Sequence, residues 1–192
     1  MRRCLVIFLL VLVLFGCGGI RYSEVAPEAK DFHPGRIGVL PVDVGTYTEA
    51  KGVIDRIVAD VLTDKAWFTD VVAAETINKQ VLSSEETGKA FLDYISKLKT
   101  VSYSDPELSR KTGELLKIDA FLMVDLTYWN YTKTEDSKVA KVEAGIRMIN
   151  ANTGQIIWKA HHYEMEEYRF MKPQLSDVAR NLMKKMIGEM PH

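Results

Sequence analysis

The sequence predicts an α/β protein: one three-layer-like domain with a mixed sheet of about five strands, a C-terminal β-hairpin and flanking helices. A nearly unbroken apolar run over residues 120–129 is typical of a central strand covered on both faces. Residues 139–149 alternate between apolar and polar side chains, and a turn-forming stretch, Asn150-Ala151-Asn152-Thr153-Gly154, joins them to a partner strand over residues 155–165. Several other segments place apolar residues at helical spacing.

The elements before the central strand follow in order. Residues 36–44 predict a first strand, in which Pro41 interrupts the pairing because it lacks an N–H donor. Thr46 and Glu49 have capping-box spacing, and a first helix follows with one apolar face. Residues 67–72 predict a short second strand, and residues 74–82 a short helix. The apolar face of the first helix consists of Val53, Ile54, Ile57, Val58, Val61 and Leu62.

Three further helices are expected. Residues 83–86 (SSEE) offer another capping box before a helix that carries Phe91, Leu92, Ile95 and Leu98. The next helix starts at residues 104–107, with Pro106 in its first turn, and runs to about Lys117. Pro173 opens the last helix, whose apolar residues are Leu175, Val178, Ala179, Leu182, Met186 and Ile187.

The N-terminus carries a targeting signal. Arg2 and Arg3 precede an apolar run over residues 5–14 that is too short to span a bilayer, which is typical of a secretory signal. Residues 14–17 (LFGC) resemble the lipobox of bacterial lipoproteins, although Phe15 is larger than the residue usually found there. The resemblance implies that Cys17 is lipidated and that cleavage occurs just before it. A simple signal peptide and an uncleaved transmembrane anchor are the alternatives.

This signal divides the chain into a signal peptide (1–16), a lipidated N-terminus with a tether (17–35) and a periplasmic α/β domain (36–192). After cleavage, 23 basic and 26 acidic residues remain, because Arg2 and Arg3 leave with the signal. This balance offers no footprint for nucleic acid. The chain has two cysteines, Cys4 and Cys17, so we expect neither a disulfide nor a cysteine-ligated metal in the mature domain, and no cofactor.

Three segments together resemble the curli-secretion (CsgG-like) superfamily and its small uncharacterised outer-membrane lipoproteins. They are residues 36–41 (RIGVLP), 118–124 (IDAFLMV) and 149–158 (INANTGQIIW), and the resemblance covers roughly residues 36–190. It implies an α/β fold but no reaction centre. The curli channel adds membrane-crossing hairpins, whereas residues 83–105 here are charged and helix-like, which favours a protein that forms no channel. Gly18 after Cys17 favours the outer membrane by the sorting rule of the resembled class.

Two groups have residue types suited to chemistry. His161, His162, Glu164, Glu166 and Glu167 include metal-ligand types, but adjacent histidines on a strand face opposite sides and cannot bind one ion together. His162, Glu164 and Glu166 could share a face, but one imidazole and two carboxylates on an exposed strand are more often solvated surface, and we interpret the group in this way.

Asp125, inside the apolar strand, is either a buried acid with a shifted pKa or a residue bonded to a neighbour such as Thr127. No nucleophile elbow or phosphate-binding loop is visible, so we expect no enzyme.

Aromatic residues at the exit of the central strand are the candidate partner-binding group: Tyr128, Trp129 and Tyr131. The alternative is that Tyr128 and Trp129 close the edge of the core. For the methionines of the last helix, core filling is favoured over docking of another subunit: Met183, Met186 and Met190.

These observations predict a lipid-anchored, periplasm-facing accessory protein of the bacterial outer membrane that acts in envelope assembly or secretion. We expect it to bind envelope protein partners that the sequence does not identify. Assembly into a homo-oligomer is compatible with the sequence. The alternatives are a component of an oligomeric curli-type secretion channel and an envelope hydrolase.

Overall fold

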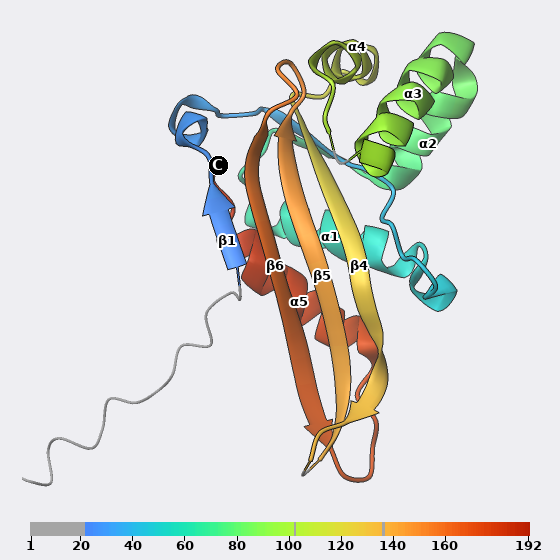
Figure 1. Cartoon of the computed structure of the whole chain (residues 1–192), viewed down its shortest axis with the longest axis vertical. Coiled ribbons are helices and arrows are strands. Elements are labelled where there is room, and N and C mark those ends of the chain that lie inside the picture. Colours follow the sequence, from blue (N-terminus) through green and yellow to red (C-terminus); the bar gives the residue numbers. More distant parts are fainter. Residues whose placement is uncertain (1–21, 102, 136) are drawn as a thin grey trace, which may run out of the picture.

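The computed structural model describes residues 22–101, 103–135 and 137–192 (Figure 1). The predicted signal peptide and Cys17 lie outside the described residues. A single six-stranded sheet has the strand order β1-β6-β5-β4-β2-β3. β2 pairs in parallel with both β3 and β4. The pairs β4–β5, β5–β6 and β6–β1 are antiparallel, so the sheet is mixed as predicted. The strands are β1 (Tyr22–Val25), β2 (Arg36–Val39), β3 (Asp70–Val72), β4 (Ala120–Lys133), β5 (Lys138–Asn150) and β6 (Ile156–Tyr168).

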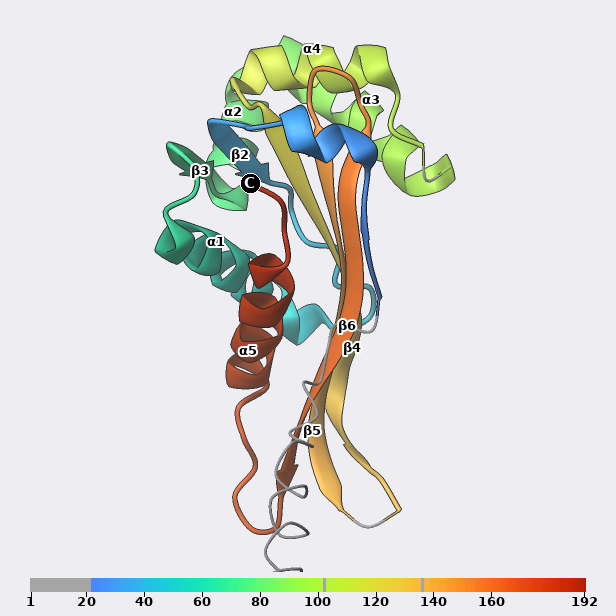
Figure 2. The ribbon, with the colours of Figure 1, turned by 90° about the vertical axis from the view of Figure 1, so that its left-hand side faces the viewer.

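Helices cover the two faces of the sheet unequally (Figure 2). α1 and α5 pack on one face, whereas α2, α3 and α4 gather on the other face at one end of the molecule, here called the proximal end. The opposite, distal end consists of the β4–β5 turn and the β6–α5 loop, which extend beyond the helices. The helices are α1 (Val53–Lys65), α2 (Ala74–Ser83), α3 (Glu85–Val101), α4 (Pro106–Leu116) and α5 (Leu175–Gly188), with short 3₁₀ turns at Pro27–Asp31 and Thr48–Ala50.

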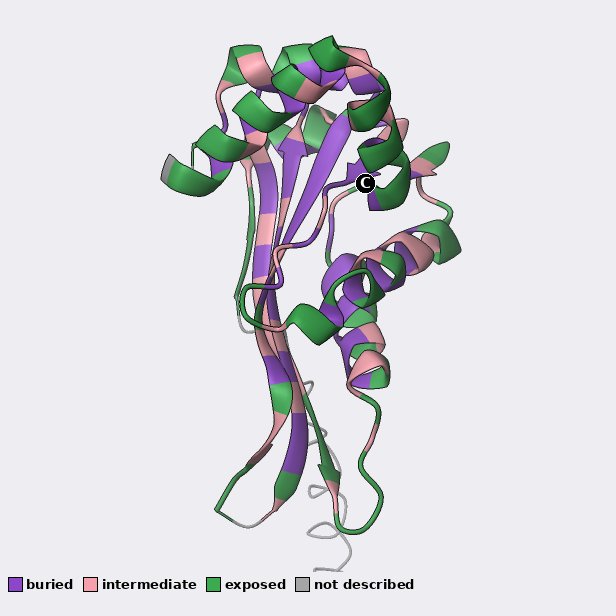
Figure 3. Ribbon diagram, turned by 90° about the vertical axis from the view of Figure 1, so that its right-hand side faces the viewer, coloured by how far each residue is buried: buried purple, intermediate pink, exposed green. Residues whose placement is uncertain are grey.

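Two cores hold the layers together. The main core lies between the sheet and the pair α1 and α5, and Trp158 and Ile54 are fully buried in it. The second core lies under α2, α3 and α4, around Tyr94 and Phe121, whose rings are 5.3 Å apart. Because only the proximal half of the sheet has a helix layer on both sides, the protein is three-layered there and two-layered toward the distal end (Figure 3).

The predicted helices are present, but two of them begin at other signals. α1 starts after Gly52, where the Asp55 carboxylate accepts hydrogen bonds from the backbone N–H groups of Gly52 (3.0 Å) and Val42 (2.9 Å). The predicted box at residues 46–49 instead leads into a 3₁₀ turn. For α3, the Ser84 hydroxyl accepts from Thr87 N–H at 3.3 Å, so the cap lies one residue later than the predicted box.

The first strand is interrupted where the sequence predicts. β2 ends at Val39, and after Pro41 the backbone N–H of Asp43 rejoins β4 by donating to the carbonyl of Val124 at 3.1 Å. The predicted strand over residues 67–72 is shorter in the structure, where β3 covers only Asp70–Val72.

β1 is the strand that the sequence did not predict. It lies within the segment assigned to a tether over residues 17–35, and it pairs antiparallel with β6 at the edge of the sheet. All four of its residues are exposed, so the strand has no apolar alternation that a sequence pattern could reveal. Its attachment comes from the backbone ladder and from Trp158, whose indole N–H donates to the Ser23 hydroxyl at 3.1 Å. The described part of the predicted tether therefore completes the sheet.

A bulge in β4 decides which side chains face each core. Leu126 pairs with Ala144 and Tyr128 with Glu143, so Thr127 is an extra residue without an opposite partner. Leu126 and Trp129 consequently both face the main core although they are three residues apart. The bulge thereby fixes the orientation of the aromatic residues that follow.

Candidate functional site

The structure divides the three aromatic residues predicted to bind a partner. Trp129 is 5% exposed and belongs to the main core, so it is not available to a partner and the prediction is wrong for this residue. Tyr128 and Tyr131 are half-buried on opposite faces of the sheet, because alternate residues of a strand point to opposite sides. The predicted group is therefore two separate surfaces.

Tyr128 pairs with Glu143 of β5 and lies on the face of the sheet opposite Trp129 and the main core. Beyond α3 and α4, no α-helix in the described part of the chain covers this face of β4, β5 and β6 (Figure 2). Its ring lies 6.1 Å from that of Tyr47. The ammonium of Lys141 lies 5.0 Å from the Tyr128 ring and 5.1 Å from the Tyr163 ring, and it forms an ion pair with Glu143 at 2.7 Å. This face, here called the open face, presents aromatic rings held between charged side chains.

Tyr131 lies in a second site, a groove of about 340 Å³ at the distal end, here called the distal groove. Its hydroxyl donates to the carbonyl of Pro173 at 2.8 Å, its ring meets that of Tyr168 edge-on at 5.9 Å, and the Lys172 ammonium lies 4.6 Å from its centre. These contacts fasten the β6–α5 loop to the sheet. The described residues that line the groove include four cations and no carboxylate: Tyr131, Thr132, Lys133, Lys138, Tyr168, Arg169, Phe170 and Lys172.

The loop residues of this site were not among the predicted binding residues. Phe170 and Met171 are 99% and 87% exposed, which is unusual for apolar side chains of their size. Arg169 and Lys172 flank them in the sequence. The signal that could have revealed them is an adjacent pair of large apolar residues in a stretch without strand or helix periodicity.

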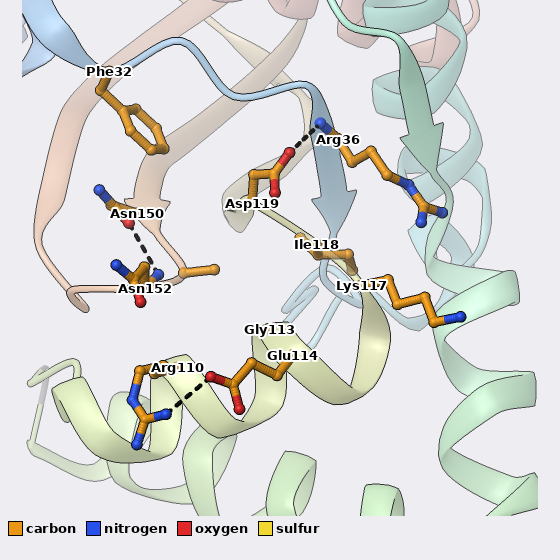
Figure 4. A pocket seen from close by; sticks show the side chains of 11 residues that line it. Phe32, Arg36, Arg110, Gly113, Glu114, Lys117, Ile118, Asp119, Asn150 and Asn152 are labelled. Carbon is orange, nitrogen blue, oxygen red and sulfur yellow. Dashed lines mark hydrogen bonds and ion pairs between the residues drawn. The ribbon is translucent and has the colours of Figure 1, made fainter.

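A larger groove of about 530 Å³ lies at the proximal end, between the N-terminus of β2, α4 and the β5–β6 turn (Figure 4). Its polar groups bind one another. Asp119 accepts from the backbone N–H of Arg36 at 2.7 Å, and the Arg110 guanidinium pairs with Glu114 at 2.9 Å. We therefore interpret this groove as a structural junction of three elements.

The histidines predicted to face opposite sides of a strand do so. His161 lies on the open face, with its Nε2 3.5 Å from a Glu143 oxygen. His162 lies on the side of α5, near Glu164 and Lys185. Glu164, two residues after His162 on the same face, pairs with Lys185 at 2.6 Å. Among the residues that the structure describes, no group of three histidine, cysteine or acidic side chains could hold a metal ion.

Asp125 has a partner that the sequence did not indicate. Its carboxylate forms an ion pair with Arg147 of β5 at 2.8 Å, one diagonal step across the sheet. Thr127, the neighbour considered in the sequence analysis, instead donates its hydroxyl to the carbonyl of Glu143 at 3.1 Å. The acid is thus held by a guanidinium on a half-exposed part of the open face.

Burial lowers the pKa of His162, and the charges of Lys185 and His161 add to this effect while Glu164 opposes it. The unfolded chain therefore takes up a proton first as the pH falls below about 6.5, and the domain should lose stability through that region. We expect His162→Gln to reduce this loss, measured by urea unfolding at a series of pH values. His33→Gln, at an exposed histidine, is the comparison. An unchanged slope in His162→Gln would contradict the expectation.

The C-terminal methionines fill the core: Met183 and Met186 lie in α5, and Met190 lies two residues after its end. Met183, Met186 and Met190 are at most 2% exposed and all belong to the main core. The favoured interpretation, core filling, is confirmed for these three residues.

Comparisons with known proteins show the fold. The chain matches no family model, and it matches no curated protein. A PelC dodecamer from Paraburkholderia phytofirmans is similar with a TM-score of 0.57 and 13% identity, over 89% of this chain and 98% of that chain. A dodecamer of a PelC variant from the same organism is similar with a TM-score of 0.56 and 14% identity, over 88% of this chain and 96% of that chain. The lipoprotein GNA1162 from Neisseria meningitidis has a TM-score of 0.49 and 15% identity, over 82% of this chain and 100% of that chain.

At these identities the likeness to PelC shows a shared α/β fold over nearly all of the described chain. The resemblance to the curli-secretion superfamily is not confirmed by these comparisons. Within the described part of the chain, no helix is both long enough and apolar enough to cross a membrane.

Proposed function

We propose that this chain is a lipid-anchored accessory protein of the bacterial outer membrane, facing the periplasm, that acts by binding an envelope protein in assembly or secretion. The observation that carries the proposal is the position of β1. This strand begins at Tyr22, only five residues after the lipobox cysteine, Cys17, so the sheet itself is attached close to the lipid. Five residues reach at most about 18 Å.

Binding rather than catalysis is supported by what surrounds the candidate catalytic residues. Asp125 is paired with Arg147, and His161 and Glu164 lie on opposite faces of β6, each near a charged partner. A hydrolase would need one of these groups to meet a second catalytic side chain in a cleft. The open face and the distal groove, in contrast, present aromatic and charged side chains, which are typical of binding surfaces.

Lipidation is tested by metabolic labelling. We expect Cys17→Ala to abolish incorporation of labelled palmitate, because the thiol that takes the lipid is gone. Cys4→Ala is the matched control, since it removes the other cysteine of the chain from a segment that cleavage discards. Label that persists in Cys17→Ala would refute the lipobox assignment.

Self-association is part of the proposal, and the crystallisation of PelC as a dodecamer supports it for a chain of the same fold. Light scattering of the protein in detergent measures the number of subunits. A photo-reactive residue at Tyr128 on the open face, followed by crosslinking in intact envelopes, identifies the bound protein. Ion conductance in planar bilayers would instead favour the alternative, a component of a curli-type channel.

A further inference from the structure

We infer that the distal end of the domain docks on the phospholipid surface, with Phe170 and Met171 inserted among the lipids and the basic residues beside them at the phosphates. This orientation rests on the proposed lipidation of Cys17. The loop that carries the two apolar residues joins β6 to α5 at the tip of the longest strands (Figure 1). It is an interaction surface separate from the open face.

The exposure of the loop is the first reason. Phe170 and Met171 are 99% and 87% exposed, so nearly all of their apolar surface is in contact with water. Transfer of such side chains to an apolar environment is favourable, and membrane-interface segments use aromatic and long apolar residues for it. The loop is not loose, because the contacts of Tyr131 with Pro173 and Lys172 hold its base against the sheet.

The direction of β1 is the second reason. β1 runs antiparallel to β6, with Tyr22 opposite His161 and Val25 opposite Trp158, so the end of β1 nearer Cys17 points toward the distal end. From His161, β6 advances seven residues to Tyr168, about 23 Å. From Cys17 to Tyr22 the chain advances five residues, which span at most about 18 Å. At full extension this linker ends about 5 Å short of the level of Tyr168, so a lipid on Cys17 places the membrane on the distal side of β1 and close to the distal end.

The charges beside the loop are the third reason. Lys133, Lys138, Arg169 and Lys172 line the distal groove, and none of the described residues lining it is acidic. Glu135, Glu166 and Glu167 are exposed near the same end but do not line the groove, although Glu167 lines an adjoining pocket that shares Lys138, Tyr168 and Arg169 with it. Cations that flank exposed apolar residues match the chemistry of a phospholipid surface, whose phosphates lie directly above the acyl chains.

Depth-dependent quenching tests this orientation on the whole lipidated protein. Phe170→Cys and Leu82→Cys are each labelled with an environment-sensitive fluorophore in vesicles of phosphatidylethanolamine and phosphatidylglycerol with brominated acyl chains. Leu82 is the matched control, because it is an apolar residue, 86% exposed, at the end of α2 on the proximal side. We expect the label at position 170 to be quenched and the label at position 82 to be unaffected. Equal quenching at both positions overturns the inference.

The contribution of the basic residues is measured with the label at position 170. Arg169→Glu with Lys172→Glu should shift the equilibrium away from the docked state by at least about twenty-fivefold, because each of the two basic residues near anionic lipid contributes about fivefold. Quenching that does not change in this variant overturns the assignment of the phosphate contacts. The label at position 170 could instead be shielded only at high protein density, without quenching by the lipids. This result overturns the inference, because the loop then contacts a second copy of the protein.

The protein without an introduced cysteine separates this inference from the proposed function. If Cys17 is lipidated, this protein takes up no fluorophore, since the mature chain has no other cysteine. If it is labelled, the anchoring proposal fails. The difference in quenching between positions 170 and 82 then still decides whether the distal end docks on the bilayer.

Discussion

Replacement of Trp158 by alanine should lower the free energy of unfolding by about 3–5 kcal/mol. The indole is fully buried in the main core, and its N–H donates to Ser23 of β1. The substitution therefore leaves a large cavity beneath the sheet and also releases the edge strand. Because domains of this size are stable by only about 5–15 kcal/mol, the loss is a large fraction of the total. Urea unfolding followed by circular dichroism measures it.

Two further variants separate the two effects of Trp158. Ser23→Ala removes the acceptor alone and should cost about 1–3 kcal/mol, because a buried indole N–H is left without a partner. Trp158→Phe keeps most of the ring but loses the N–H, so its cost should lie between those of the other two variants. A Trp158→Ala protein within about 1 kcal/mol of the wild type would show that the cavity collapses or that this core contributes little.

Gly154→Val should be the second most damaging change, with a loss of about 2–5 kcal/mol. Gly154 has a φ of +70°, a left-handed conformation that disfavours a β-branched residue. A Cβ at this position would lie 3.0 Å from Cα of Pro106 and 3.1 Å from the carbonyl oxygen of Ser104, both in the backbone at the start of α4. The substitution would therefore strain the turn and push α4 away from it.

Gly45→Val is the matched control for this collision. Gly45 is also left-handed, with a φ of +52°, but no atom lies within 4 Å of the position that its Cβ would take. Gly45→Val should lower the free energy of unfolding only by the cost of the left-handed backbone, about 1–2 kcal/mol. The difference between the two variants, measured by urea unfolding, isolates the contact between the turn and α4. Equal losses would contradict the role assigned to that contact.

Sequence reasoning recovers the parts of this fold that local patterns determine. The apolar run at 120–129 is a strand paired on both sides, and the turn at 150–154 joins two antiparallel strands. In the turn, the Asn150 side chain accepts from the backbone N–H groups of Asn152 and Thr153, at 2.9 and 3.3 Å. Chemistry of this kind is contained in five adjacent residues, so it can be predicted without knowledge of the rest of the chain.

The features that sequence reasoning missed depend on distant partners. β1 is an exposed tetrapeptide, YSEV, that forms a strand by pairing with the edge of β6. The ion pair between Asp125 and Arg147 depends on the register of β4 and β5. The bulge at Thr127 places Trp129 inside the core, which no pattern of residue types indicated. The candidate site was therefore only half predicted: Tyr131 was named, but the loop beside it was not.

The attachment of β1 also determines how the domain would bear mechanical load. Strand hydrogen bonds in an antiparallel pair run perpendicular to the strands. A pull from the lipid through Tyr22 acts along β1, so the bonds to β6 and the link from Ser23 to Trp158 resist it together. A pull at right angles would break the same bonds one after another. In the docked orientation, the four exposed residues of β1 thus connect the bilayer to the sheet, and a pull from the lipid loads their hydrogen bonds to β6 in shear.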